Sequence, residues 1–534
     1  MTLKFRSMLY VALASIVLTN CGGSSIITTP VENIDSVPIK VTKLTEAQKK
    51  NWGHLDLVAD TIPGMAVDKA YAEIIKNKKG KKVIVAVIDS GIDIDHKDLD
   101  DVIWTNKKEI PNNGKDDDNN GYVDDVHGWN FLGDGYNEQL EYVRMIRNGE
   151  TSNPRYKEAL ELLEKDTKKY QGYKSQYDAI SQRLTSADEA LTKHFGKSDY
   201  TKEEVASLKT EDETLKGAAQ MMNYMFANGL DSVADAKKEI SGAQESINDR
   251  LNYHLNKNFL GRKTKDDVND FTDIGYGNGN VKPVKKSESH GTHVAGIIAA
   301  ERNNGLGANG VANHVEIMSL RVVPNGDEYD KDVALAIRYA VDNGAKVING
   351  SFGKSFSPHA DKVREAIKYA SDNDVVFVHA AGNDSNDVDV KPNFPDDNVN
   401  YVEVSNTYIR VGSLTSKYGS NMVSSFSNYG KKNVDIFAPG SDIYSTVPGN
   451  EYEANSGTSM AAPAVAGVAA LVRSYYPNLT AAQVKQVILD SGLALNTKVM
   501  AGKNKDAVAF TELCTSGKIA NAYNALIFAS RIGK

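Results

Sequence analysis

Runs of β-branched and other apolar residues, separated by amphipathic stretches, recur through most of the chain. The first run, at 83–88, has no polar alternation, which is typical of a strand buried on both faces. Similar runs follow at 315–323, 347–351, 375–380 and 408–411. Helical patterns lie at 294–300, 332–343, 362–373 and 461–476. This alternation predicts an α/β fold with a doubly wound, mostly parallel sheet and helices on both of its faces.

The pattern changes over 137–285, where strand-like runs are missing and Lys, Glu, Gln and Ala are frequent. Apolar residues recur near helical spacing over 155–184 and 202–255, and Thr201 with Glu204 matches a capping box. We interpret this stretch as an α-helical insertion into a domain formed by 51–136 and 286–534. It is a platform for substrates or partners, a lid, or a structural helical hairpin; the sequence leaves these alternatives open.

The beginning of the chain has the pattern of an export signal. Lys4 and Arg6 precede an apolar run over 8–18, which is too short for an ordinary membrane span. We therefore predict a signal peptide over 1–20 and, because the next residues are polar and include prolines, a flexible tether over 21–50. We find no transmembrane pattern after residue 20.

The residues around Cys21 resemble a bacterial lipoprotein signal, in which the cysteine is acylated and becomes the new N-terminus. Asn20 departs from the small residue that is usual before that cysteine. The resemblance implies a protein held by a lipid on Cys21 at the membrane of the cell envelope, on the periplasmic face or at the cell surface. Plain secretion is the alternative.

Composition narrows the classes of function. The formal net charge is −8, and without the two cations of residues 1–20 it is −10, which opposes nonspecific nucleic-acid binding and favours cations. Cys21 and Cys514 are the only cysteines, so a disulfide framework is excluded. Cys514 is expected to be a small buried apolar residue.

Three short motifs carry residues suited to nucleophilic catalysis. Asp89 ends the first buried run, and the carboxyl ends of such strands line the crevice of an open α/β sheet. His290 begins a helical stretch rich in small residues, where an imidazole can act as a general base. Ser459 follows a glycine turn and also enters a helix, so it is suited to be an exposed nucleophile. Each motif alone also fits a plain turn or helix cap.

Together and in this order, the three motifs resemble the subtilisin-like serine peptidase family, the subtilases. The resemblance covers about 80–135 and 286–490. It implies a serine endopeptidase acting on proteins or peptides, in which Ser459 attacks the carbonyl, His290 moves the proton and Asp89 orients the imidazole. Asp89 and His290 are 201 residues apart, far more than in compact subtilases, and the insertion accounts for the excess.

The same resemblance assigns further roles. It implies that Asn383 donates to the developing oxyanion, together with the Ser459 backbone N–H. It implies that an extended substrate pairs with the edge segment Ser351-Phe352-Gly353, and that Ala381 and Gly382 line the pocket for the residue before the cut. Because no charged residue marks that pocket, we expect a broad preference with a bias toward apolar side chains.

An acidic loop after the first strand has the composition of a calcium site. Its Asp-x-Asp-x-Asn-Gly core places oxygen ligands at alternate positions around a turn, which suits a hard cation, and a solvated turn is the alternative. The candidate ligands are Asp116, Asp118, Asn120, Asp124 and the Tyr122 carbonyl. Asp98 and Asn304 lie in segments that resemble the halves of a second calcium site of some subtilases. No organic cofactor is expected.

Between Cys21 and the first strand about sixty residues remain, much of them assigned to the tether, so a full inhibitory prodomain is not expected. A chain without residues 21–75 is accordingly expected to fold and to cleave casein. Two other functions compete with the peptidase interpretation. One is a catalytically silent peptide-binding scaffold, and the other is an adhesion or assembly module in which the insertion binds a partner.

Overall fold

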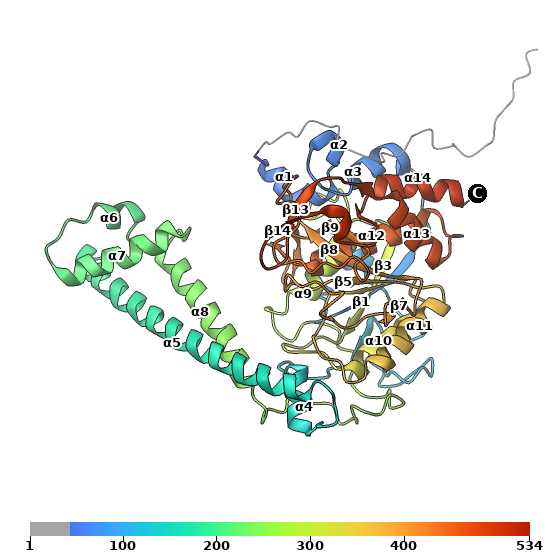
Figure 1. Cartoon of the computed structure of the whole chain (residues 1–534), viewed down its shortest axis with the longest axis horizontal. Coiled ribbons are helices and arrows are strands. Elements are labelled where there is room, and N and C mark those ends of the chain that lie inside the picture. Colours follow the sequence, from blue (N-terminus) through green and yellow to red (C-terminus); the bar gives the residue numbers. More distant parts are fainter. Residues whose placement is uncertain (1–42, 534) are drawn as a thin grey trace, which may run out of the picture.

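The computed structural model describes residues 43–533. A nine-stranded sheet of order β12-β15-β9-β8-β5-β4-β1-β3-β2 forms the centre of the main domain, and β12 with β15 is its antiparallel pair (Figure 1). Its strands are β1 (Val83–Asp89), β2 (Gly128–Asn130), β3 (Val315–Arg321), β4 (Val347–Gly350), β5 (Val376–Ala380), β8 (Tyr408–Leu414), β9 (Ile436–Pro439), β12 (Leu493–Ala494) and β15 (Lys518–Ile519).

Successive residues of β1 point to opposite faces of the sheet, and both faces are covered. Val85 and Val87 belong to an apolar cluster that also contains residues of α9, α12, α13 and α14, whereas Ala86 and Ile88 belong to one that contains residues of α10 and α11. The doubly wound fold predicted from the sequence is therefore confirmed. The helices are α9 (His290–Ala299), α10 (Asp330–Asp342), α11 (Ala360–Asp372), α12 (Thr458–Tyr475), α13 (Ala481–Ser491) and α14 (Ala522–Ile532).

Three two-stranded hairpins complete the strands of the domain. They are β6 (Asn398–Val399) with β7 (Val402–Glu403), β10 (Ile443–Val447) with β11 (Glu451–Asn455), and β13 (Lys498–Ala501) with β14 (Asp506–Ala509). Cys514 is fully buried in a third apolar cluster beside β9, as expected, and burial raises the pKa of its thiol to about 11.

The order of the strands places a crevice at the end of β1. The chain continues from β1 to β2 and β3 on one side of it, and then crosses to β4 on the other side. Strands on the two sides of such a switch point lead their loops in opposite directions, which opens a crevice at their carboxyl ends. Asp89, the last residue of β1, lies at this crevice.

The N-terminal helices belong to the domain, which corrects the predicted extent of the tether. They are α1 (Glu46–Asn51), α2 (Leu57–Asp60) and α3 (Val67–Ala70). A capping box between Thr45 and Gln48 starts α1, so 46–50 is helical. Trp52, which is 2% exposed, donates from its indole nitrogen to the Ser441 carbonyl at 3.1 Å. The signal peptide, Cys21 and the first part of the tether lie outside the described residues.

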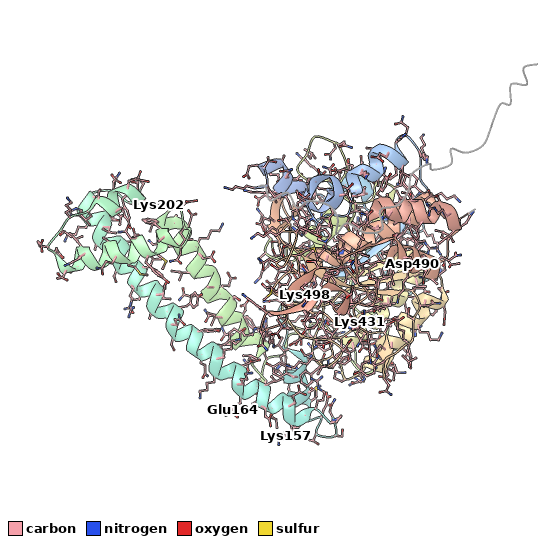
Figure 2. All side chains as sticks on the ribbon, turned by 45° about the horizontal axis from the view of Figure 1, so that its top comes forward. Lys157, Glu164, Lys202, Lys431, Asp490 and Lys498 are labelled. Carbon is pink, nitrogen blue, oxygen red and sulfur yellow. The ribbon has the colours of Figure 1, made fainter. Side chains whose placement is uncertain are left out.

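An arm of helices projects from the domain between β2 and α9 (Figure 1). We define the arm as residues 141–255. It consists of α4 (Glu141–Asn148), α5 (Tyr156–Phe195), α6 (Lys202–Ser207), α7 (Glu213–Ala227) and α8 (Val233–Asp249), followed by a short π-helical turn (Arg250–His254). The 40 residues of α5 span about 60 Å at 1.5 Å per residue. Lys157 and Glu164 lie near the attached end, and Lys202 lies near the far end (Figure 2).

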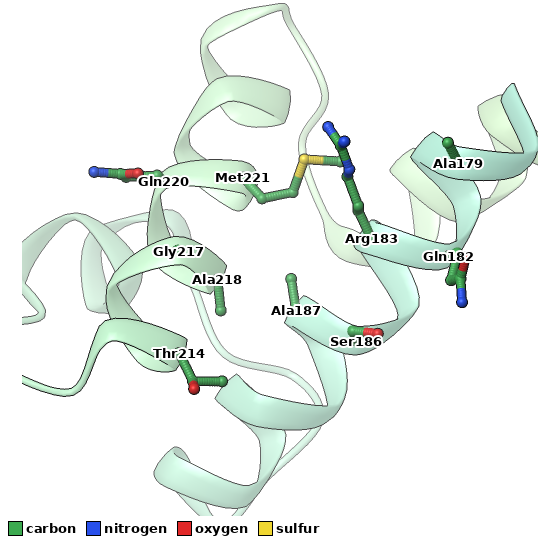
Figure 3. Close-up of a pocket in the computed structure, with 10 residues that line it drawn as sticks. All are labelled: Ala179, Gln182, Arg183, Ser186, Ala187, Thr214, Gly217, Ala218, Gln220 and Met221. Atoms are coloured by element: carbon green, nitrogen blue, oxygen red, sulfur yellow. The ribbon is translucent and has the colours of Figure 1, made fainter. Parts of the chain in front are cut away.

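The arm has an apolar cluster of its own at the far end, centred on Leu184, Leu191, Met222 and Ile240. A pocket of about 750 Å³ opens nearby between α5 and α7 (Figure 3). Apart from Met221 its lining is small or polar, with Arg183 as its charged residue, so we assign it no chemistry. Between residues 43 and 533, no helix has both the length and the hydropathy that a membrane span needs.

The predicted boundary of the insertion needs a second correction. Residues 256–285 contain no helix and return along the domain. The Tyr276 carbonyl accepts from the Trp129 indole at 2.9 Å, and the Val281 carbonyl accepts from the Ile92 N–H at 3.0 Å. The high content of Asn, Asp and Gly explains why this part is not helical, since these residues have low helix propensity.

Candidate active site

Asp89 and His290 form a hydrogen-bonded pair at the end of β1. The His290 Nδ1 atom lies 2.8 Å and 3.0 Å from the two carboxylate oxygens of Asp89. The Asp89 side chain is 1% exposed, whereas the His290 side chain is 40% exposed. The next residue must be small because a Cβ atom at Gly291 would lie 2.3 Å from the Gly91 carbonyl oxygen. The glycine therefore allows the start of α9 to approach the turn after β1.

The environment of His290 favours its protonated form. Burial disfavours the imidazolium, but the charge of Asp89 and its hydrogen bond outweigh burial, so the pKa of His290 is raised above its usual value. Because Nδ1 is bound to Asp89, the Nε2 atom is left to exchange a proton with a neighbour.

Ser459 is the second residue of α12, which packs beside α9 on the same face of the sheet. Its Oγ atom donates to the Ser351 carbonyl at 3.2 Å, and the Ser351 hydroxyl donates back to the Ser459 carbonyl at 2.9 Å. That carbonyl is available because Pro463, four residues later in α12, has no N–H. The proline therefore leaves room for the bond that joins the serine turn to the end of β4.

The side-chain amide of Asn383 has a fixed orientation. Its Oδ1 atom accepts from the Thr458 N–H at 2.9 Å and from the Thr458 hydroxyl at 3.0 Å. A backbone N–H can only donate, so the oxygen must face Thr458 and the Nδ2 atom must face away. Among the described residues, Nδ2 has no hydrogen-bond partner, and a Cβ atom at Gly457 would lie only 3.5 Å from it. Sequence reasoning missed this role of Thr458.

The segments proposed to contact substrate lie next to these residues. The backbone N–H and carbonyl of Gly353 make no hydrogen bond within residues 43–533. Both are therefore available to pair with an added strand. Gly382 has a φ of +100°, and a Cβ atom there would lie 2.4 Å from the Asn428 amide nitrogen. The Ala381 side chain is completely buried in the apolar cluster beside β9, so it does not itself line the pocket. Phe352 is 9% exposed.

The acidic loop brings together only some of its predicted ligands. Carboxylate oxygens of Asp116 and Asp118 lie within 4.8 Å of each other and of Glu109, which sequence reasoning missed. Glu109 is 6% exposed, and its Oε2 atom has no hydrogen-bond partner. The Asp124 carboxylate instead accepts from two backbone N–H groups, at 3.1 Å and 2.9 Å. Asn120 accepts from the Tyr122 N–H at 2.8 Å.

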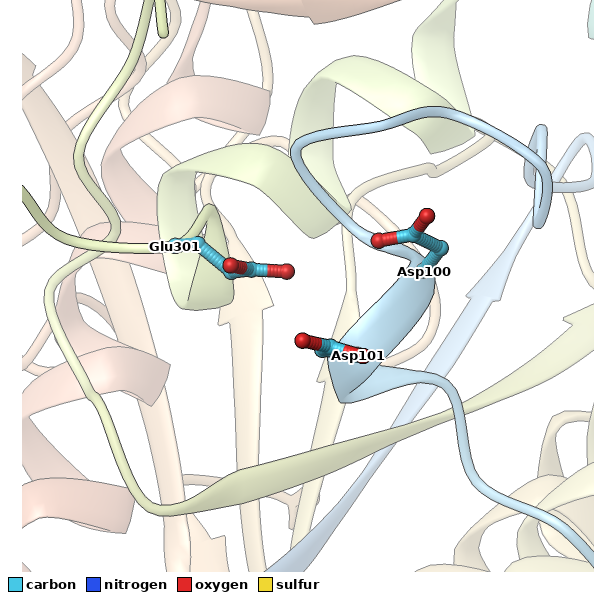
Figure 4. A group of neighbouring side chains, drawn as sticks. All are labelled: Asp100, Asp101 and Glu301. Carbon is cyan, nitrogen blue, oxygen red and sulfur yellow. The ribbon is translucent and has the colours of Figure 1, made fainter. Parts of the chain in front are cut away.

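Asp98 and Asn304 also meet, as a hydrogen-bonded junction. The Asn304 Nδ2 atom donates to Asp98 at 2.7 Å, while its Oδ1 atom accepts from the Leu306 N–H at 2.9 Å. Asn304 thus presents nitrogen toward the carboxylate, and nitrogen of an amide does not bind calcium. Close by in sequence, Asp100, Asp101 and Glu301 form a second group of neighbouring carboxylates, of which the two aspartates are exposed (Figure 4).

The fold and the site define the class: an α/β protein with an aspartate, a histidine and a serine at the carboxyl edge of a doubly wound sheet. Residues 80–511 match the model of the subtilase family, and the chain belongs to this family. The resemblance inferred from the three motifs is thereby confirmed.

Similar proteins cover parts of the chain. The chain is 44% identical over 187 residues to the thermophilic serine proteinase of Bacillus sp. (strain AK1), and the match covers 35% of this chain and 43% of that protein. It is 42% identical over 191 residues to thermitase of Thermoactinomyces vulgaris, covering 36% and 63%. A solved structure of proteases from Pseudoalteromonas arctica PAMC 21717 has 32% identity and a TM-score of 0.36, covering 45% and 70%. The match thus spans less than two thirds of both named relatives.

Proposed function

We propose that this protein is a serine endopeptidase that hydrolyses proteins or peptides through an acyl-enzyme on Ser459. The observation that carries the proposal is the pairing of buried Asp89 with half-exposed His290 next to the helix that presents Ser459. Membership of the subtilase family supports the same activity. Similar proteins are named as serine proteinases.

In the proposed reaction, the Ser459 hydroxyl turns from the Ser351 carbonyl toward Nε2 of His290. His290 takes the proton as the oxygen attacks the scissile carbonyl, and Asp89 stabilises the imidazolium. His290 then returns the proton to the leaving amine, which departs and leaves an ester on Ser459. Water, deprotonated by His290, hydrolyses the ester and restores the serine.

The developing negative charge needs donors that are already in place. We assign the Asn383 Nδ2 atom and the Ser459 N–H to this task, because Thr458 occupies the Asn383 oxygen and so leaves the amide nitrogen as the free donor. Loss of one such donor typically costs about 10²–10³ in kcat. We therefore expect Asn383→Leu to lower kcat by about that factor and to leave KM nearly unchanged.

Recognition of the substrate is assigned to main-chain pairing. An extended peptide would add to the segment 351–353, where the N–H and carbonyl of Gly353 are without partners among the described residues. Gly382 would form the wall of the pocket for the residue before the cut, and its positive φ gives that wall its shape.

A fluorophosphonate probe tests the activity directly. The wild-type protein should be labelled and should cleave casein, whereas Ser459→Ala should do neither. Ser456→Ala is the matched control, because Ser456 lies in the same turn and its hydroxyl binds the Asp442 N–H at 2.8 Å. An unlabelled wild-type protein that folds normally would favour the silent peptide-binding scaffold instead.

We further propose a structural calcium ion held by Glu109, Asp116 and Asp118. Subtilases generally bind calcium, and a buried carboxylate oxygen of Glu109 without a hydrogen-bond partner fits a cation ligand. Asn120, Asp124 and the Tyr122 carbonyl remain predicted ligands from the sequence. The ion would bind the loop to the residues before it, which stabilises the fold.

Calcium should raise the melting temperature of the wild-type protein after dialysis against a chelator. At a hundred times Kd the gain in stability is about 2.7 kcal/mol. Glu109→Gln should lose most of this shift, whereas Glu301→Gln, in the other carboxylate group, should keep it. A full calcium shift in Glu109→Gln would refute the assignment of Glu109.

We also propose export followed by acylation of Cys21, on the basis of the residues around it. Cells fed with a labelled fatty acid should incorporate it into the wild-type protein and not into Cys21→Ser. If both stay unlabelled while the protein is found outside the cell, plain secretion is the correct alternative.

A further inference from the structure

We call the attached end of the arm, residues 141–159 with 250–255, its root. The root lies beside the segment 351–353 that is proposed to pair with substrate. Lys354 follows this segment directly, and its side chain is 2% exposed. Its ammonium lies 2.6 Å from a carboxylate oxygen of Glu141, 2.7 Å from the Glu328 carbonyl and 2.9 Å from a carboxylate oxygen of Asp330. Because Glu141 begins α4, the first helix of the arm, this lysine joins the arm to the proposed substrate site.

Glu141 is itself held rigidly. Arg144, 1% exposed, contacts both of its carboxylate oxygens, at 2.5 Å and 3.3 Å. The same guanidinium donates to the carbonyls of Asp327 and Glu328. Burial disfavours the Glu141 carboxylate, but the charges of Arg144 and Lys354 outweigh burial and lower its pKa to about 2. Glu141 is therefore held as a carboxylate between the two cations.

The arm also contacts the two residues after Lys354. Arg155 donates to the Ser355 carbonyl at 2.5 Å, and its guanidinium lies 3.8 Å from the centre of the Phe356 ring. Phe356 is 3% exposed and packs in a cluster supplied mainly by the arm: Tyr142, Val143, Met145, Ala159 and Leu255. Three consecutive residues of the domain are thus bound by the arm.

On its other side, the same segment is bound to the active site. Ser351 exchanges two hydrogen bonds with Ser459, and the backbone of Lys354 exchanges two with Phe394, at 3.0 Å and 2.9 Å. Only two residues, Phe352 and Gly353, separate the nucleophile's partner Ser351 from Lys354, which binds the arm. A shift of the Lys354 backbone must therefore move Gly353, whose N–H and carbonyl have no hydrogen-bond partner within residues 43–533.

We propose that Lys354 is a positioning residue through which the root of the arm sets the geometry of the substrate-pairing segment 351–353. The inference rests on the proposed peptidase function and concerns how that site binds an extended chain. It gives the insertion a role in substrate binding by way of its root. A buried ion pair that contributes only to stability is the competing explanation.

Kinetics with substrates of two lengths separate these explanations. A tetrapeptide anilide should pair with the whole segment 351–353, whereas an ester of a single blocked amino acid lies beside Ser351 and does not extend to Gly353. Lys354→Met should raise KM for the tetrapeptide by roughly tenfold or more with kcat nearly unchanged. Hydrolysis of the short ester and the rate of fluorophosphonate labelling should change by less than about twofold.

A matched control is Lys485→Met in α13. Lys485 is also a largely buried lysine, 3.1 Å from Glu403 and 3.6 Å from Asp435, but it belongs to a helix that packs on α12 and α14. It should lower the melting temperature without any dependence on substrate length. If Lys354→Met does not fold, Glu141→Gln supplies the test, since it removes the charge of the partner and keeps its hydrogen-bonding oxygen.

Three results would overturn the inference. Lys354→Met could lose activity equally toward both substrates, or it could lose none. Lys485→Met could also show the same dependence of activity on substrate length. A wild-type protein that is not labelled and cleaves neither substrate would instead overturn the proposed peptidase function. The two failures are therefore distinguishable.

Discussion

The main domain and the arm are stabilised in different ways. In β1 every residue except Ile84 is buried, because helices cover the sheet on both faces. In α5 only four of 40 residues are buried, and three of them belong to the cluster at the far end. The domain therefore depends on one continuous core, whereas the arm depends on a small local core and on its root. We expect the two to unfold separately.

The largest predicted effect is the difference in folding between a deletion at the N-terminal end of the main domain and a deletion in the arm. Removing residues 43–75 takes away Trp52, Met65, Val67 and Ala70 among other buried residues. The structure therefore predicts the opposite of what the sequence suggested for a chain without residues 21–75. At about 1.5–3 kcal/mol for each large buried side chain, the loss rivals the whole stability of a domain. We expect this variant to be unfolded by circular dichroism and calorimetry.

A much longer deletion in the arm should be tolerated. Replacing residues 179–243 by a short Gly/Ser linker joins helices that are adjacent, since Asp178 and Gln244 are hydrogen-bonded at 2.7 Å. The root is retained, so the variant should fold and react with the fluorophosphonate probe. If the variant without residues 179–243 were unfolded while the variant without residues 43–75 folded, the proposed difference between the domain and the arm would be wrong.

The second prediction uses the same substitution in both regions. Leu471 in α12 and Leu191 in α5 are both completely buried. Each change to alanine should cost about 2–5 kcal/mol where it is made. Calorimetry should show Leu471→Ala lowering the main transition, and Leu191→Ala lowering only a separate transition of the arm while proteolytic activity persists. A single shared transition would show that the regions unfold together.

The third prediction concerns the pH dependence of catalysis, which should depend on residues of the main domain alone. His290 must be neutral to act as a base, and its pKa is raised, so kcat/KM should climb as pH rises through a value above 6.5. The ion pair with Asp89 stabilises the fold fully below the unfolded pKa of about 6.5, and this contribution is lost as pH rises through the folded pKa. The arm deletion should have the same pH profile.

Asp89→Asn is the informative variant for that profile. It removes the charge that raises the pKa of His290, so the apparent pKa should fall while kcat drops by about 10⁴. A profile that stays unchanged in Asp89→Asn would contradict the assigned pair.

The smallest predicted effect lies on the arm surface. Lys157 and Glu161 of α5 are 3.9 Å apart and are 90% and 69% exposed. Solvent screens such a pair, so Lys157→Ala should leave both unfolding transitions and all activity unchanged within error. A clear loss of activity would show that this face of the arm has a function of its own.

Much of the fold was predictable because long strands and helices leave a periodic pattern. The strands β1, β3, β4, β5 and β8 were all anticipated, and the four residues of β4 were found because they are part of a longer apolar run, whereas β2, β12 and β15 have only two or three residues and β9 has four. Such short runs cannot be told from loops by periodicity. The return of 256–285 onto the domain was missed because its few anchors, such as Tyr276 and Val281, are separated by polar residues.

The sequence by itself determined the sheet, the exposed helical character of the arm, and the three motifs that carry Asp89, His290 and Ser459. These are local properties, because periodicity and turn chemistry depend on residues that are close together in the chain. Only the tertiary structure decided that Glu109 joins Asp116 and Asp118, that Thr458 orients Asn383, and that Glu141 of the arm reaches Lys354. The last two contacts join residues distant along the chain, and the first depends on how a loop without a periodic pattern folds back, so no local pattern encodes any of them.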